Sequence, residues 1–226
     1  RGLGDVYKRQ IGGTGSGKST LVNLIPRFYD ASEGRVLFDG ADVKEYPMEK
    51  LRGKIGIVPQ KATLFRGTIR ANIQWGKQDA TDEEIYEALE IAQAKEFVQE
   101  KPKALDTMIS QGGKNLSGGQ RQRLTIARAL VRKPEVLILD DSASALDFAT
   151  DAKLRKAIAE RTKDMTVFLV SQRAASILHA DKIIVMDDGM VAGIGTHQQL
   201  LKTCEVYREI CYSQLSKEEV EQYEKE

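Results

Sequence analysis

The chain has 226 residues, long enough for one large domain or two small ones. Its 34 lysines and arginines are matched by 33 aspartates and glutamates, so the net charge of +1 gives no electrostatic argument for a nucleic-acid or anionic-membrane partner. With 41% hydrophobic and 30% charged residues, the composition is that of a soluble globular chain. No apolar run approaches the roughly 18 residues that would cross a bilayer.

The first ten residues differ from the rest of the chain and show neither strand alternation nor a helical period. A phosphate-binding loop normally follows a buried apolar strand, but here the charged Lys8 and Arg9 lie where that strand should run. We therefore interpret residues 1–10 as a non-native head on an N-terminally truncated chain. A divergent native strand is the alternative. Loss of the strand would expose an edge of the central sheet.

Strands and helices alternate along the rest of the chain. Helical spacing, a capping box or a following proline indicates helices over residues 20–25, 81–92, 118–131 and 149–160, and from 204 onward. Apolar runs bounded by turn residues predict strands over residues 35–39, 55–58, 136–139, 166–170, 182–186 and 190–194. This alternation indicates an α/β fold with a mainly parallel sheet.

A glycine-rich turn matches the phosphate-loop pattern G-x-x-x-x-G-K-[ST] with the residues Gly12, Gly13, Thr14, Gly15, Ser16, Gly17, Lys18 and Ser19. Glycines let backbone N–H groups converge on phosphate oxygens, and the helix that follows adds a favourable dipole. Lys18 would reach the β- and γ-phosphates, Ser19 would ligate Mg²⁺, and Thr20 would complete the nucleotide-binding set. The motif predicts a nucleoside triphosphate without separating kinases, GTPases, helicases and transport ATPases.

The apolar run of residues 136–139 ends in Asp140. A buried parallel strand places such a carboxylate at the carboxyl edge of the sheet, which is where phosphate turns also lie. Asp140 could there hold Mg²⁺ through water. A strand-end aspartate that only caps a turn is the alternative.

A third motif, Leu-Ser-Gly-Gly-Gln at residues 116–120, resembles the signature of the ATP-binding cassette (ABC) family, the ATPase domains of ABC transporters. Other segments follow in that family's order: Gln60 resembles the Q-loop, residues 144–147 the D-loop, and Gly189 with residues 195–197 the usual tail. The resemblance covers residues 11–216 and implies a P-loop NTPase fold. Residues 75–130 would form its helical subdomain, and residues 217–226 a charged tail.

This resemblance implies that two chains sandwich two Mg·ATP molecules, each between the phosphate loop of one chain and the signature of the other. The signature residues Ser117, Gly118, Gly119 and Gln120 would meet the second nucleotide, because a helix N-terminus is a ready anion site. A plain N-cap is the alternative role for Ser117. Gln60 would ligate Mg²⁺ when the dimer closes. Residues 64–73 further resemble exporters with fused membrane helices, which residues 46–75 would contact.

Two catalytic positions depart from the family pattern. The family usually has glutamate directly after the strand that ends in the position of Asp140. Here that residue is Asp141, whose side chain is shorter by one methylene, about 1.5 Å. The switch histidine is replaced by Gln172, which can hydrogen-bond the γ-phosphate but cannot titrate near neutral pH. We expect this site to bind ATP but hydrolyse it poorly, while the intact signature completes a partner's site. The pattern resembles one half of a heterodimeric exporter; a homodimer with a slow aspartate site is the alternative.

The expected protein is thus an exporter's ATPase domain on the cytoplasmic face of the cell membrane, with a second ABC subunit and a transmembrane domain as partners. Cys204 and Cys211 would lie about 10 Å apart on one helix, so reduced thiols fit this setting. A group of basic residues is interpreted as a solvated helix face, not a nucleic-acid stripe: Arg121, Arg123, Arg128, Arg132 and Lys133. A soluble ABC ATPase without a membrane domain is the alternative, and a binding module without turnover is a third reading.

Overall fold

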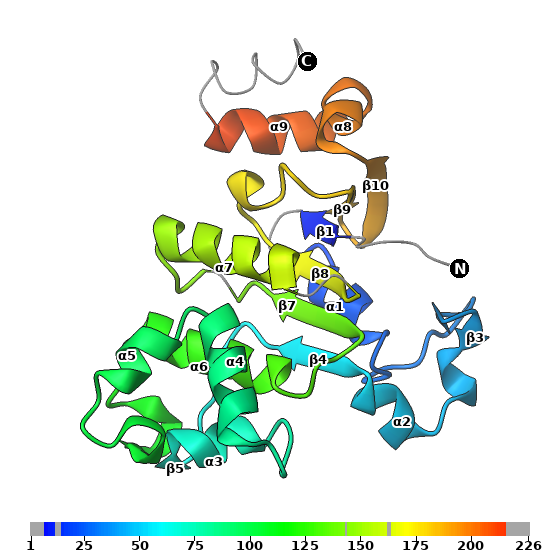
Figure 1. Cartoon of the computed structure of the whole chain (residues 1–226). Coiled ribbons are helices and arrows are strands. Elements are labelled where there is room, and N and C mark those ends of the chain that lie inside the picture. Colours follow the sequence, from blue (N-terminus) through cyan, green and yellow to red (C-terminus); the bar gives the residue numbers. More distant parts are fainter. Residues whose placement is uncertain (1–6, 12–14, 143, 162–163, 216–226) are drawn as a thin grey trace. The chain divides into compact units, whose positions relative to one another are not determined.

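The computed structural model describes residues 7–11, 15–142, 144–161 and 164–215 (Figure 1). The chain divides into two compact units, residues 1–55 with 166–226 and residues 56–165. The predicted fold class, α/β with a mainly parallel sheet and helices, is confirmed. Within the described ranges, no helix is both long and apolar enough to cross a membrane.

The sheet of the first unit carries the strands in the order β10-β9-β1-β8. β1 (Tyr7–Ile11) pairs in parallel with β8 (Thr166–Val170) on one side and with β9 (Lys182–Asp187) on the other. β10 (Met190–Gly195) pairs antiparallel with β9 after a tight turn. A register shift between Val191 and Gly193 interrupts this last pairing.

The strand β1 occupies the position that we expected to be vacant, so the expected exposed sheet edge was wrong. Its register pairs Tyr7 with Val167 and Ile11 with Val185. The ladder uses backbone N–H and C=O groups, which Lys8 and Arg9 supply as well as apolar residues do. The non-native origin of residues 1–10 stays a prediction.

Helices α8 (His197–Thr203) and α9 (Glu205–Gln214) complete the core of the first unit with the 3-10 turn η4 (Ala174–Ser176). The buried cluster comprises Ile11, Ala174, Ile177, Ala180, Ile183, Val185, Leu200, Leu201, Cys204, Tyr207 and Cys211. Both cysteines are free thiols, as expected, and both are buried; Cys204 lies just before α9 and not on the same helix as Cys211.

The remaining elements of this unit are short. They are α1 (Lys18–Asn23), β2 (Leu37–Phe38), β3 (Ala41–Asp42), the 3-10 turn η1 (Val43–Glu45) and α2 (Met48–Gly53). The helix predicted over residues 20–25 begins at Lys18 and ends at Asn23. Pro26 accounts for the early end, because a proline disfavours helical backbone at the residue before it.

The second unit joins two strands to a group of helices. β7 (Val136–Asp140) is a hydrogen-bonded neighbour of β4 (Ile55–Val58), most of which belongs to this unit. The other elements are β5 (Gly67–Thr68), α3 (Ile69–Gln74), α4 (Asp82–Ile91), α5 (Lys95–Gln99), η2 (Ala104–Asp106), β6 (Met108–Ile109), η3 (Gln111–Gly113), α6 (Gly118–Leu130) and α7 (Phe148–Arg161).

Helix α6 is the centre of this unit and packs against α3 and α4. Gly76, just after α3, permits a close approach, because a Cβ there would collide with the carbonyl oxygen of Arg128. Helix α4 begins with the predicted capping box between Thr81 and Glu84, and its buried face presents Ile85 and Leu89. The packing therefore fixes where the N-terminus of α6, with the signature, begins.

Candidate functional site

The phosphate loop leaves β1 at Ile11 and enters α1 at Lys18. The predicted residues Gly12, Gly13 and Thr14 lie outside the described residues. Gly15 and Gly17 have φ angles of 83° and 88°, which glycine adopts without the steric cost of a Cβ. Lys18 is buried and its Nζ donates to Ser16 Oγ at 3.0 Å. Ser19 and Thr20 are exposed in the first turn of α1.

The turn between β9 and β10 holds one side of this loop. The backbone N–H of Gly189 donates to the carbonyl oxygen of Ser16 at 3.3 Å. A Cβ on Gly17 would lie 3.6 Å from Gly189 Cα, so the two glycines approach closely. Sequence reasoning grouped Gly189 with the tail motif and missed this contact, because a hydrogen bond across 173 residues leaves no local pattern.

Two of the predicted catalytic residues meet in the second unit. Gln60 follows β4, Asp141 follows β7, and Gln60 Nε2 donates to Asp141 Oδ2 at 3.1 Å. Asp141 has a φ of 45°, and its carbonyl accepts bonds from Ser144 N at 3.3 Å and Ser144 Oγ at 2.9 Å. The backbone around Asp141 is thus fixed from one side and its carboxylate from another. Asp140 ends β7 and is half-buried.

The signature opens α6 with a second capping box. Ser117 Oγ accepts a bond from the backbone N–H of Gln120, and Gln120 Oε1 accepts one from the backbone N–H of Ser117, both at 3.1 Å. The predicted N-cap role of Ser117 is therefore present. The box satisfies the N–H groups of Ser117 and Gln120, whereas those of Gly118 and Gly119 have no partner within the helix by geometry. A hydroxyl that accepts one bond can still donate another to an anion.

Three of the basic residues, Arg121, Arg123 and Arg128, do not form the solvated face that we expected, whereas Arg132 and Lys133 are exposed as predicted. Arg121 Nη1 donates to the carbonyl oxygens of Leu116 at 2.7 Å and Gly113 at 3.3 Å, directly beneath the signature. Arg123 Nη1 donates to the Gln93 carbonyl at 2.6 Å.

Burial lowers the pKa values of Arg123 and Arg128 from the ordinary arginine value. Arg128 Nη2 donates to the carbonyl oxygen of Thr63 at 2.9 Å. These side chains organise the backbone, a role that spacing along a helix cannot reveal.

The switch segment, residues 171–174, follows β8 in the first unit. Gln172 is exposed, and Ser171 Oγ accepts a bond from Arg173 N at 3.0 Å. As expected, His179 is exposed and His197 starts α8. His197 is buried, with Nδ1 2.8 Å from the hydroxyl of Tyr207, and its pKa is lowered by burial and then by His179.

The predicted site residues are divided between the two units. Lys18, Ser19 and Gln172 belong to the first unit, whereas the second unit carries Gln60, Asp140, Asp141 and the signature. The predicted metal ligands Ser19, Gln60 and Asp140 offer hydroxyl, amide and carboxylate oxygens, which suit Mg²⁺. No group of three or more histidine, cysteine or acidic residues among the described residues could hold a metal alone. The role of these three residues as magnesium ligands stays a prediction.

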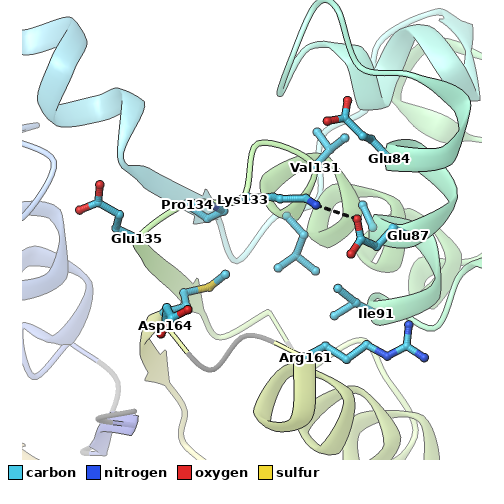
Figure 2. A pocket seen from close by; sticks show the side chains of 12 residues that line it. Glu84, Glu87, Ile91, Val131, Lys133, Pro134, Glu135, Arg161 and Asp164 are labelled. Carbon is cyan, nitrogen blue, oxygen red and sulfur yellow. Dashed lines mark ion pairs between the residues drawn. The ribbon is translucent and has the colours of Figure 1, made fainter. Parts of the chain in front are cut away.

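A cavity of about 290 Å³ in the second unit contains none of the predicted site residues (Figure 2). Charged residues of its lining already have ion-pair partners, either in the lining or beside it. Lys133 bonds to Glu87 at 2.9 Å, Glu84 bonds to Lys77, and Arg161 bonds to Glu90. This cavity is therefore not the candidate site.

Comparison with known proteins gives consistent matches. A family model described as "ABC transporter" matches residues 10–144. An uncharacterized ABC transporter ATP-binding protein of Mycobacterium tuberculosis is 48% identical over 207 residues, which cover 90% of this chain and 35% of that protein. A putative multidrug export ATP-binding/permease protein of Bacillus subtilis is 48% identical over 191 residues, covering 84% and 33% respectively.

A solved structure, a bacterial Atm1-family ABC exporter with ATP bound, matches with a TM-score of 0.90 and 36% identity. The match covers 94% of this chain and 37% of that one. The chain thus spans about a third of the length of the relatives that it matches.

Proposed function

This chain belongs to the ABC transporter family as an ATPase domain, and from that premise we propose that it is the motor of an ABC exporter with a weak hydrolytic site of its own. Relatives named as export ATP-binding/permease proteins support the exporter assignment. The chain spans about a third of them, so we propose that a transmembrane domain works with it at the cytoplasmic face of the membrane.

We propose a head-to-tail dimer with a second ABC subunit around two Mg·ATP. The phosphate loop with Lys18 would bind one nucleotide, and the start of α6 would meet the other. The exposed Ser117 and Gly118 and the completed capping box support this, because the helix start is already ordered before any anion arrives. Arg121 supports the same segment through the Leu116 carbonyl.

The observation that carries the weak-site proposal is the bond from Gln60 to Asp141 at 3.1 Å. This bond directs the shorter carboxylate towards the Gln60 amide, and aspartate lacks the methylene that could extend it towards water. A positioned general base typically contributes 10²–10⁴-fold to a rate, so a small misplacement is costly. Magnesium, held through Ser19, Gln60 and Asp140, would supply charge neutralisation for the triphosphate.

A pair of exposed aromatic side chains supports the proposed contact with membrane helices. Phe65 and Trp75 stack with ring centroids 4.7 Å apart, and they are 44% and 68% exposed. The buried Asn72 fixes the loop beneath them by bonding both N–H and C=O of Phe65 at 2.9 Å. An exposed, rigid aromatic surface in the stretch after Gln60 suits an apolar helix of a transmembrane partner.

The test compares steady-state ATP hydrolysis by the unmodified chain with that of a double variant, Asp141→Glu with Gln172→His. We expect slow turnover by the unmodified chain and an increase of at least about tenfold in the double variant, because both catalytic groups are restored. Lys18→Ala in the double-variant background is the control and should remove the gain. Vigorous turnover by the unmodified chain alone would contradict the proposal and favour a homodimer with a working aspartate.

A further inference from the structure

One side chain of helix α9 bonds the backbone at and immediately after the switch position, Gln172. Gln214, the last residue of α9, accepts a bond from the backbone N–H of Ala174 at its Oε1, and its Nε2 donates to the carbonyl oxygen of Gln172. Both distances are 2.8 Å, and the partners lie 40 and 42 residues away along the chain. The Gln214 amide therefore bonds through both its oxygen and its nitrogen to the segment of residues 172–174.

The helix that carries Gln214 is firmly seated. Tyr207 and Cys211 on α9 are fully buried, in one apolar cluster with Ala174 and Ile177 of the switch side. Helix α9 contacts both η4 and β9. The amide of Gln214 thus reaches the switch segment from an element whose position the core fixes.

The side chain and the backbone of Gln172 differ in their surroundings. The side chain of Gln172 is exposed, whereas its carbonyl and the N–H two residues later are both held by Gln214. The direction of a side chain follows from the backbone that carries it. Gln214 holds the two peptide groups that flank Arg173, and the first of these begins at the Gln172 carbonyl. This restricts the backbone on the C-terminal side of Gln172 and thereby the directions open to the Gln172 amide.

We propose that Gln214 is a positioning residue for Gln172, through which the C-terminal helix sets recognition of the γ-phosphate. This inference rests on the proposed function, in which Gln172 bonds the γ-phosphate. It assigns α9 a regulatory part: a displacement of this helix would loosen the switch segment and reduce the preference for a triphosphate over a diphosphate.

The experiment measures the ratio of affinities for a non-hydrolysable Mg·ATP analogue and for Mg·ADP in the full chain. Gln214→Met removes both hydrogen bonds with little change in side-chain volume. We expect the preference for the triphosphate to fall about threefold to tenfold, with ADP affinity unchanged. A purely structural role would lower both affinities together, and that result would overturn the proposal.

Gln199→Met is the matched control. Gln199 Oε1 accepts a bond from Thr196 N at 3.0 Å in the capping box of α8, so this variant also deletes a side-chain bond to backbone in the same unit. It should lower the melting temperature and leave the affinity ratio unchanged. If Gln214→Met does not fold, Gln214→Glu keeps the acceptor for Ala174 and loses the donor to Gln172, with the same expected direction.

The variant Gln172→Ala tests the role of Gln172 separately from that of Gln214. If Gln172→Ala leaves the affinity ratio unchanged, the role proposed for Gln172 fails, and the function of Gln214 fails with it. If Gln172→Ala lowers the ratio and both Gln214 variants do not, only the inference about Gln214 is wrong. In the double variant Gln172→Ala with Gln214→Met we expect no further loss, whereas additive losses would show that Gln214 acts independently.

Discussion

Asp141 occupies a backbone conformation that helps to explain the choice of aspartate over glutamate. Its φ of 45° lies in the left-handed region, which the short side chains of aspartate and asparagine tolerate better than longer ones. Restoring glutamate would extend the carboxylate but add backbone strain. Aspartate at this position therefore gives a less strained turn after β7, but its carboxylate reaches less far than that of glutamate.

His197 makes the first unit sensitive to acid. Burial, and then the charge of His179, lowers the pKa of His197 below its ordinary value of 6.5. The folded state therefore binds fewer protons than the unfolded state, so stability is complete above the unfolded pKa and is lost as pH falls below it. The hydrogen bond to Tyr207 links this group to α9.

We expect the melting temperature of the unmodified chain to fall between pH 8 and about pH 5.5, and to fall less in His197→Gln. The comparison is between melting temperatures of the same chain at the two pH values. His179→Gln is the control, since this exposed histidine should leave most of the acid sensitivity in place. An identical decline in the unmodified chain and His197→Gln would rule out His197 as its source.

At the scale of elements, local patterns identified the longer helices and strands well. The strand of residues 136–139 appears as β7, and the capping box at Thr81 starts α4 where the sequence predicted it. Elements held only by tertiary pairing were missed. β1 carries charged residues in its sequence, and β5 and β6 have two residues each, too few for a period.

Two hairpin turns offer a matched test of the contact between Gly189 and the phosphate loop. Asp39-Gly40 has φ angles of 49° and 80°, and Asp188-Gly189 has 41° and 77°. A Cβ on either glycine would meet nothing within 4 Å, so an alanine at each faces only backbone strain. Only Gly189 bonds to Ser16.

We expect Gly40→Ala and Gly189→Ala to destabilise the fold equally, by about 1 kcal/mol. Only Gly189→Ala should weaken Mg·ATP binding, because relief of its strain shifts the N–H that holds the Ser16 carbonyl. Thermal unfolding and nucleotide titration of both variants provide the measurements. Equal nucleotide affinities in the two variants would show that the turn does not support the loop.

At the scale of the whole molecule, the order of four motifs predicted the fold and family, because each motif carries its own backbone requirement. The supporting contacts could not be predicted, since Gln60 with Asp141, and Gln214 with Gln172, are joined across 81 and 42 residues. Arg121 was misinterpreted for the same reason: its partners are carbonyl groups that have no sequence signal.

The most direct test of the account is the affinity of the chain for Mg·ATP with and without the amine of Lys18. We predict that Lys18→Ala weakens binding at least about tenfold, because it removes the charge that meets the β- and γ-phosphates. Lys44→Ala is the control, a lysine whose Nζ bonds to the Ala31 carbonyl at 3.1 Å in the same unit, and it should bind as the unmodified chain does. Undiminished Mg·ATP affinity in Lys18→Ala would contradict the account.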